Sequence, residues 1–142
     1  EWGASGANEY MTDEVKTAAN YVDPLKSSNN IGAVSNITIG WKENDSKDKK
    51  LERIITQKWI ATFPNGQEAW TEFRRTGYPK LSPVKQSLEP TINPANGEFI
   101  KKLRYVDNEI NNNKEYATDP ALNGGQGDGL SVRVWWDTAR YK

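Results

Sequence analysis

The sequence predicts a mainly α-helical fold organised around one helical hairpin at residues 51–79. The first observation behind this prediction is that apolar residues recur every four positions from Leu51 onward, which is the period of a helix face. The second is that a further helical stretch follows a short break at Pro64 and stops at Gly77. The third is that Pro, Gly and Asn punctuate the rest of the chain too densely for other long helices.

The first helix of the hairpin is predicted from its amphipathic pattern. One face is apolar and consists of Leu51, Ile55, Trp59 and Phe63. Glu52 and Arg53 fall outside this face, so we expect them on the exposed side. Asp48 is the expected N-cap, because short acidic side chains accept hydrogen bonds from the first free backbone N–H groups. Pro64 cannot donate a backbone hydrogen bond and should end the helix.

The second helix is predicted from its end signals. Asn65 is the expected N-cap, and Glu68 follows it at the spacing of a capping box. Trp70 and Phe73 share one face, and a pair of arginines occupies the last turn, where the helix dipole favours cations. Gly77 supplies the stop. Two helices joined by so short a turn form an antiparallel pair whose aromatic faces need a partner surface.

The regions on either side of the hairpin are expected to be mostly irregular. Before it, residues 1–50 should hold short helical turns near 7–11 and 13–20. Alternating apolar residues predict a brief extended segment at 37–41, with Ile37, Ile39 and Trp41 on one side. We treat residues 1–50, 51–79 and 80–142 as three parts of one domain.

The loop-rich tail, residues 80–142, carries three further expectations. A short helix is expected around residues 108–116, and the glycine-rich stretch at 123–129 should form a turn. Alternating apolar residues at 130–136 predict an extended end. Asp107 begins a partial match to a calcium-binding loop, but this match lacks the glycine and the glutamate that such loops require. We therefore expect no metal and no cofactor.

Composition excludes several classes of function. Among 142 residues, 19 basic and 19 acidic side chains give a formal net charge of zero without a basic run, which argues against nucleic-acid binding. The absence of cysteine excludes disulfides and thiolate zinc sites within the chain. The hydrophobic share of 35% is low, yet it includes 6 Trp and 6 Tyr, residues that suit interfaces as well as cores.

Several separated motifs carry a resemblance to a known family. They are QKWIATFPNGQEAW and FRRTGYP in the hairpin, KKLRYVDNE at 101–109, VWWD at 134–137 and the early Trp2-Gly3 pair. In this order they resemble the closing portion of SusD-like (SusD/RagB) proteins. Members of that family are much longer, so we expect this chain to be the C-terminal portion of such a protein.

The resemblance implies a fold, a place and a partner. The fold would be the SusD-like α-helical fold, with tetratricopeptide-like helix pairs and a loop-rich C-terminal region. The full-length protein would be a lipid-anchored protein of the outer membrane, exposed at the cell surface in bacteria of the Bacteroidetes type. It would bind a glycan or another nutrient and deliver it to a SusC-like TonB-dependent transporter. The lipid-bearing cysteine would lie in the N-terminal region outside this chain.

Two other classes of function stay open at this point. A helical protein–protein interaction domain without a small ligand would use the aromatic faces of the hairpin as its contact surface. A glycoside hydrolase would need two carboxylates across a sugar, and Glu68 with Glu72 can share a helix face. We expect no enzymatic activity, because the chain has no His or Cys and these two acids read as capping or surface groups.

A sugar site needs an exposed aromatic platform with polar groups at its edge. Trp41 is the best candidate, since Asn44 and Asp45 follow it in a polar loop. Tyr21 and Tyr78 are the weaker candidates for the same role. For Trp41 the alternative is an aromatic residue buried against another part of the protein.

Overall fold

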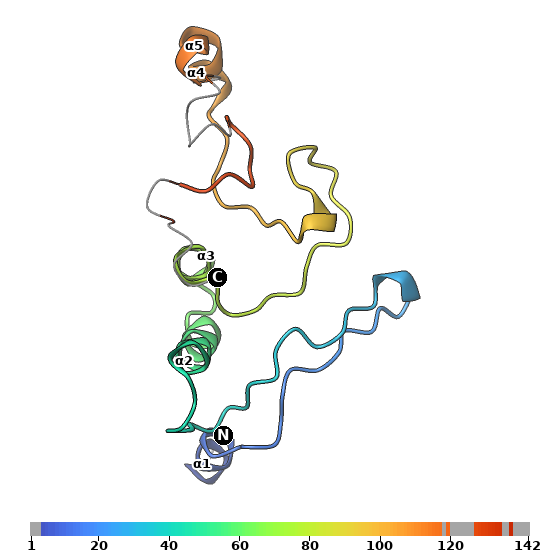
Figure 1. Ribbon diagram of the computed structural model, residues 1–142, viewed down its shortest axis with the longest axis vertical. Helices are drawn as coiled ribbons and strands as arrows, with labels where there is room; N and C mark the ends of the chain where they lie inside the picture. The colour runs from blue at the N-terminus through green and yellow to red at the C-terminus, as the bar shows by residue number, and fades with distance from the viewer. Residues whose placement is uncertain (1–3, 118, 120–126, 135–136, 138–142) are drawn as a thin grey trace. The chain divides into compact units, whose positions relative to one another are not determined.

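The computed structural model describes residues 4–117, 119, 127–134 and 137. Its elements in order are α1 (Ala4–Met11), the 3-10 turn η1 (Ser27–Asn29), α2 (Lys47–Ala61), α3 (Gly66–Thr76), the 3-10 turn η2 (Pro94–Asn96), α4 (Asp107–Asn112) and α5 (Lys114–Ala117) (Figure 1). The described residues contain no strand, and a single antiparallel bridge joins Tyr21 to Ile31. The prediction of a mainly α-helical chain is confirmed.

The described residues fall into two compact units, one ending at Ser82 and the other beginning at Pro83. The first unit holds α1, α2 and α3, and the second holds α4 and α5. No helix among the described residues has the length and the apolar character that crossing a membrane requires.

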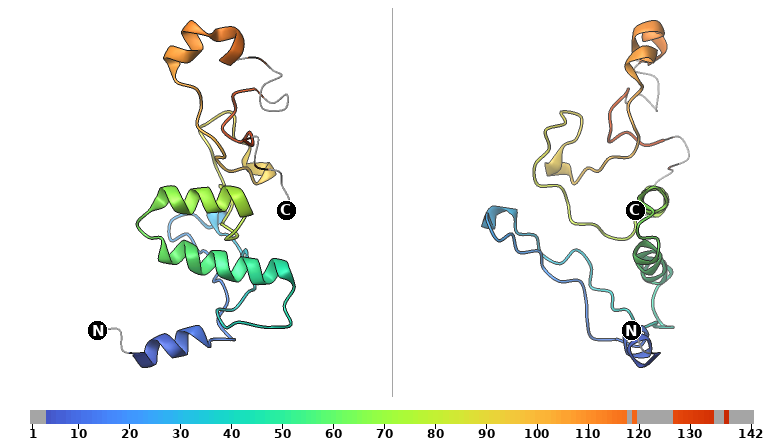
Figure 2. Two further views of the ribbon diagram at one scale, coloured as in Figure 1. Left: turned by 90° about the vertical axis from the view of Figure 1, so that its left-hand side faces the viewer. Right: turned by 180° about the vertical axis from the view of Figure 1, so that it is seen from behind.

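The hairpin of α2 and α3 forms as predicted. Figure 2 shows the two helices side by side and antiparallel. The Asn65 side chain caps α3 by accepting a hydrogen bond from the Glu68 N–H at 3.2 Å. In a complete capping box, the Glu68 side chain would accept a hydrogen bond from the Asn65 N–H. Here the Asn65 N–H donates to the Thr62 carbonyl instead. Gly77 ends α3 in the left-handed region, at φ 75°, and its N–H donates to the Phe73 carbonyl at 2.8 Å.

The N-cap of α2 differs from the prediction. Ser46 occupies this position, and its side chain accepts from the Lys49 N–H at 3.3 Å. Asp48 lies inside the first turn, where its charge interacts favourably with the helix dipole. Serine and aspartate are comparably good N-caps, so the type of side chain does not decide between the two positions. With Ser46 as the cap, the helix gains Lys47 and Asp48, and this longer helix is the one that forms.

The core of the hairpin is smaller than the apolar pattern predicts. Ile55 and Phe73 are buried, and the rings of Trp59 and Phe73 meet edge to face with centroids 6.5 Å apart. Phe63, predicted on the same face, is 88% exposed, because α2 ends at Ala61 and the helical register is lost before Phe63.

Glu52 and Arg53 are buried, contrary to the expectation that they face solvent. The Arg53 guanidinium forms an ion pair with Asp45 at 2.9 Å and donates to the carbonyl and the hydroxyl of Thr38. The Glu52 carboxylate accepts a hydrogen bond from the Ser35 hydroxyl at 2.5 Å. Buried charges are tolerated when they are paired in this way, so these two residues fasten the 35–45 segment to α2.

Of the two helical turns predicted within residues 1–20, the first is present and the second is absent. The turn expected at 7–11 is part of α1. The helix expected at 13–20 is absent, because the Asp13 carboxylate accepts hydrogen bonds from the N–H groups of Val15 and Lys16, at 2.9 and 2.8 Å. Such a turn offers the backbone an alternative to the helix.

The second unit contains polar contacts between segments far apart in the sequence. The Thr91 hydroxyl accepts from the Leu130 N–H at 3.1 Å, and the Thr91 carbonyl accepts from the Ser131 hydroxyl at 3.0 Å. Lys102, which is buried, forms an ion pair with Asp128. The helix predicted around 108–116 is present as two short helices, α4 and α5, divided at Asn113.

Several sequence predictions fall partly outside the described residues. They concern the Trp2-Gly3 pair, residues 123–126 of the predicted turn, and Trp135 and Trp136 of the predicted extended end. Of that end, residues 130–131 form a turn and 132–134 are irregular.

Candidate functional site

Trp41 lies in the loop that leads into α2, and its side chain is held by two charged neighbours. The residue is 47% exposed. Its indole N–H donates to the Glu43 carboxylate at 2.7 Å, and the Lys50 ammonium lies 5.3 Å from the ring centroid. Lys50 and Glu43 also form an ion pair at 3.0 Å. Trp41 is therefore a partly exposed aromatic side chain whose edge and one face are already in contact with protein groups.

The backbone before Trp41 is fixed by contacts to two other segments. The Gly40 N–H donates to the Asp13 carbonyl at 2.7 Å. A Cβ at Gly40 would lie 2.9 Å from Cγ of Glu14 and 3.2 Å from the Asp13 carbonyl oxygen, so only glycine fits without a shift. Two residues before Gly40, Thr38 is held by Arg53. The loop therefore leaves the scaffold at a defined place.

These contacts decide which residues of the 37–41 segment are buried. The sequence pattern placed Ile37, Ile39 and Trp41 on one side of an extended segment, and the buried residues are Thr38 and Gly40, which alternate with them. Hydrogen bonding to Arg53 and close backbone approach at Gly40 outweigh the apolar alternation. Ile37, Ile39 and Trp41 consequently remain partly or largely exposed.

The other candidate residues do not gather around Trp41. Asn44 is exposed in the turn that follows, so it does lie on the same loop. Asp45, expected at the edge of the platform, is engaged by Arg53. Tyr21 is 50% exposed and belongs to the 21–31 loop, which projects away from α2 in Figure 1 and in the right-hand view of Figure 2.

Tyr78 follows α3 and is only partly exposed. Burial raises the pKa of its hydroxyl, and the nearby carboxylates of Glu52 and Asp48 raise that pKa further. Its backbone N–H donates to the Thr76 hydroxyl at 3.1 Å. These surroundings place the Tyr78 side chain beside α2, near Glu52 and Asp48.

A cleft of about 250 Å³ in the first unit was not predicted. It lies between α2 and the segments 16–18 and 35–39, and its lining includes Ile37, Ile39 and Ile60. The hydroxyl of Tyr10 donates to the Gln57 side chain at 3.0 Å among the lining residues. No local motif marks this cleft, because its walls come from five separate parts of the sequence.

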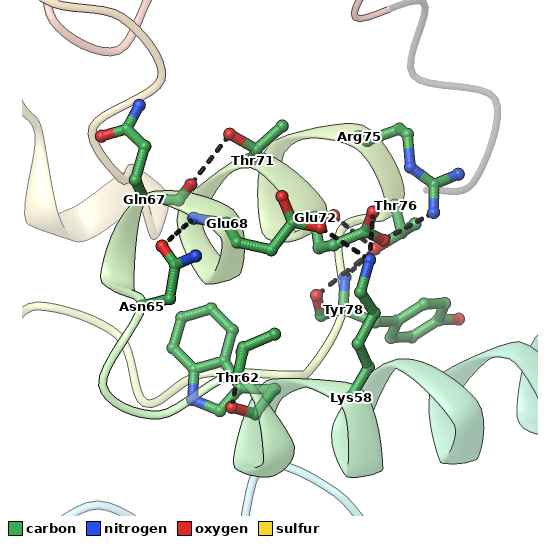
Figure 3. Close-up of polar contacts among 11 residues, drawn as sticks. Lys58, Thr62, Asn65, Gln67, Glu68, Thr71, Glu72, Arg75, Thr76 and Tyr78 are labelled. Carbon is green, nitrogen blue, oxygen red and sulfur yellow. Dashed lines mark hydrogen bonds and ion pairs between the residues drawn. The ribbon is translucent and has the colours of Figure 1, made fainter.

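The two acids considered for hydrolysis have structural partners. Figure 3 shows Lys58 of α2 reaching toward Glu72 of α3. The Lys58 ammonium lies 2.8 Å from Glu68 and 3.0 Å from Glu72, and Arg75 lies 2.6 Å from Glu72. The hydrogen bond from Arg75, supported by Lys58, holds the pKa of Glu72 below its ordinary value. A general acid for glycoside hydrolysis needs a raised pKa, which is the opposite of the shift at Glu72. The ion pairs of Glu68 and Glu72 with Lys58 instead join α3 to α2.

Metal binding would require several acidic side chains to converge on one point. Within residues 4–117, 119, 127–134 and 137, no group of three or more acidic side chains is arranged to hold a metal ion.

Comparisons with known proteins place the chain in a family. Residues 1–137 match the SusD-like family model, described as SusD and RagB outer membrane lipoprotein. A search of curated protein sequences finds no match.

Solved structures of SusD homologues are similar over nearly the whole chain. A chitin-binding SusD homologue from Flavobacterium johnsoniae is 45% identical with a TM-score of 0.78, covering 93% of this chain and 27% of its own. A SusD-like protein from Bacteroides thetaiotaomicron is 37% identical with a TM-score of 0.77, covering 92% and 28%. A SusD homologue from Bacteroides uniformis is 40% identical with a TM-score of 0.77, covering 96% and 28%.

The chain thus spans less than a third of the length of each of these three solved structures. The predicted SusD-like α-helical fold is confirmed by the agreement of both sequence and structure. The chain belongs to the SusD-like family of outer-membrane lipoproteins.

Proposed function

We propose that the protein binds a glycan at the cell surface and delivers it to a SusC-like TonB-dependent transporter. The observation that carries this proposal is the family match over residues 1–137, joined by 45% identity to a chitin-binding homologue. Because that homologue binds chitin, chitin-type polysaccharides are the first ligands to try.

Within this chain, the proposed carbohydrate contact is the Trp41 loop. An exposed indole offers a flat apolar surface to the apolar face of a sugar ring, and polar groups at its edge can hold hydroxyls. Trp41 is about half exposed, and Asn44 is exposed on the same loop. Tyr21 is a second, separate contact in this proposal, since it is equally exposed on the projecting 21–31 loop. Tyr78 is the weakest of the four, because it is partly buried.

The proposed role is binding without catalysis. The chain has no histidine or cysteine, and the two helix carboxylates considered for hydrolysis, Glu68 and Glu72, are engaged by Lys58. The SusD-like family is described as one of outer-membrane lipoproteins, which supports attachment through a lipid at the N-terminal end of the full-length protein. Association with the transporter and exposure at the cell surface belong to the same proposal.

The experiment is affinity electrophoresis of the full-length protein on a panel of glycans that includes glycol chitin. Retardation by at least one polysaccharide, with no release of reducing ends during incubation, is the expected result. Lack of retention by every glycan, together with intact uptake of peptides, would overturn the carbohydrate version. Co-purification of a SusC-like transporter with the tagged protein tests the partner. Release of sugar that disappears in Glu68→Gln or Glu72→Gln would instead support a hydrolase.

A further inference from the structure

We propose that Glu43 and Lys50 together hold the Trp41 indole in one orientation, so that a sugar ring stacks on the indole face opposite Lys50. We call these two residues the indole clamp. The inference rests on the proposed function and adds two residues that position the aromatic platform.

The three side chains form a closed set of contacts. One oxygen of the Glu43 carboxylate, Oε1, accepts from the Trp41 indole N–H at 2.7 Å. The other, Oε2, pairs with the Lys50 ammonium at 3.0 Å. The ammonium in turn lies 5.3 Å from the centroid of the Trp41 ring, within the range of a cation–π contact. Each partner therefore restrains the other two.

The clamp is anchored in the scaffold through Lys50. This lysine belongs to the first turn of α2, and only 26% of its side chain is exposed. The Glu43 side chain is 80% exposed and comes from the loop itself. An aromatic side chain on a loop that makes no contacts of its own must be ordered when a ligand binds, and this loss of conformational entropy weakens affinity. Contacts to a helical residue restrain the ring before the ligand arrives.

The clamp also decides which side of the ring is available. The ammonium of Lys50 lies over one face of the indole, so stacking is directed to the other face. Trp41 remains 47% exposed with these contacts in place. Glu43 holds its negative charge at the ring edge, since the hydrogen bond from Trp41 lowers the pKa of its carboxyl. Its remaining lone pairs can accept a hydrogen bond from a sugar hydroxyl beside Asn44.

The first test needs no glycan. In full-length protein with isotope-labelled tryptophan, the Trp41 indole N–H signal is assigned by its loss in Trp41→Phe. Lys50→Met and Glu43→Met should increase the fast motion of this indole and speed exchange of its N–H with water. Lys49→Met, an exposed neighbour in the same helical turn, is the matched control and should behave as wild type. Lys50→Arg keeps a cation at this position, so the indole should move as little as in wild type. Unchanged indole motion in both clamp variants would overturn the inference.

The second test measures retention of the same variants on glycol chitin. Lys50→Met should weaken retention about two- to fivefold, as expected for losing one exposed cation–π contact, while the melting temperature stays that of wild type. Lys50→Arg should be retained like wild type. If Trp41→Ala abolishes retention and both clamp variants bind normally, the clamp is refuted while the proposed function stands. If the wild-type protein is not retained, chitin is refuted as the ligand, and the indole measurement decides the clamp.

Discussion

The α2–α3 hairpin and the 35–46 segment differ in how they use their polar residues. The hairpin pairs its charges across its own two helices, as Lys58 does with Glu72. The 35–46 segment has no regular structure and is tied through Asp45 and Thr38 to Arg53 of α2. Its aromatic residue, Trp41, stays about half exposed. The comparison shows a rigid element that fixes the position of an irregular one, which is a common arrangement for binding loops.

Phe73→Ala should have the largest effect, because it empties the aromatic contact at the centre of the hairpin. Phe73 is buried, with the ring of Trp59 at its edge. Truncating a buried phenylalanine typically costs about 3–5 kcal/mol of unfolding free energy. Urea unfolding of the full-length protein measures this cost. Phe63→Ala is the matched control, and since Phe63 is 88% exposed its effect should be within about 0.5 kcal/mol. Equal effects of the two variants would contradict the assignment of the core.

Arg53→Met should come next, because it breaks the link between the two regions. It leaves the Asp45 carboxylate, whose side chain is 14% exposed, without its guanidinium partner. Removing one partner of a largely buried ion pair costs about 3 kcal/mol or more. The double variant Arg53→Met with Asp45→Asn should lose less than the sum of the single variants. Strict additivity in urea unfolding would show that the pair does not hold the loop.

Whether a structural feature could be predicted from the sequence depends on how far apart in the chain its interacting residues lie. The caps at Asn65 and Gly77 were predicted because each involves residues within four positions. The burial of Glu52 and Arg53 was missed because their partners, Ser35 and Thr38, lie 17 and 15 residues away without a local signal.

The candidate site shows the same limit. The sequence indicated Trp41 and Asn44 as neighbours on a polar loop. In the structure both residues lie on that loop and are exposed. The sequence did not indicate Lys50, because its approach to Trp41 depends on how the loop turns into α2. It also did not indicate that Arg53 engages Asp45, because these two residues lie eight positions apart without a local signal.

Gly40→Ala should have an intermediate effect and tests whether the loop leaves the scaffold at a fixed place. The added Cβ would meet Glu14 and the Asp13 backbone, at 2.9 and 3.2 Å. Overpacking of this kind costs about 1–3 kcal/mol. Gly32→Ala is the control, because a Cβ there meets no atom within 4 Å. Thermal melts of both variants provide the measurement. A neutral Gly40→Ala would mean that the backbone can move aside there.

A smaller effect is expected from titrating Glu72 in the hairpin. The pKa of this carboxyl is lowered in the folded protein, chiefly by the hydrogen bond from Arg75. Its contribution to stability is therefore present above the ordinary pKa of 4.5 and is lost as the pH falls through the lowered value. Glu72→Gln should destabilise the protein at neutral pH and converge on wild type as the pH falls below the lowered pKa of Glu72. A constant difference between the two proteins across this range would contradict the assigned ion pairs.

The most direct test of the division between scaffold and binding loop is Trp41→Ala in the full-length protein, with glycan affinity and melting temperature measured on the same sample. Affinity for a glycan that retards wild type should fall by about tenfold or more, while the melting temperature stays within about 2 °C of wild type. Truncating another exposed aromatic residue, in Tyr116→Ala, should change neither quantity. Unchanged affinity in Trp41→Ala, or a loss of affinity that only accompanies unfolding, would contradict this division.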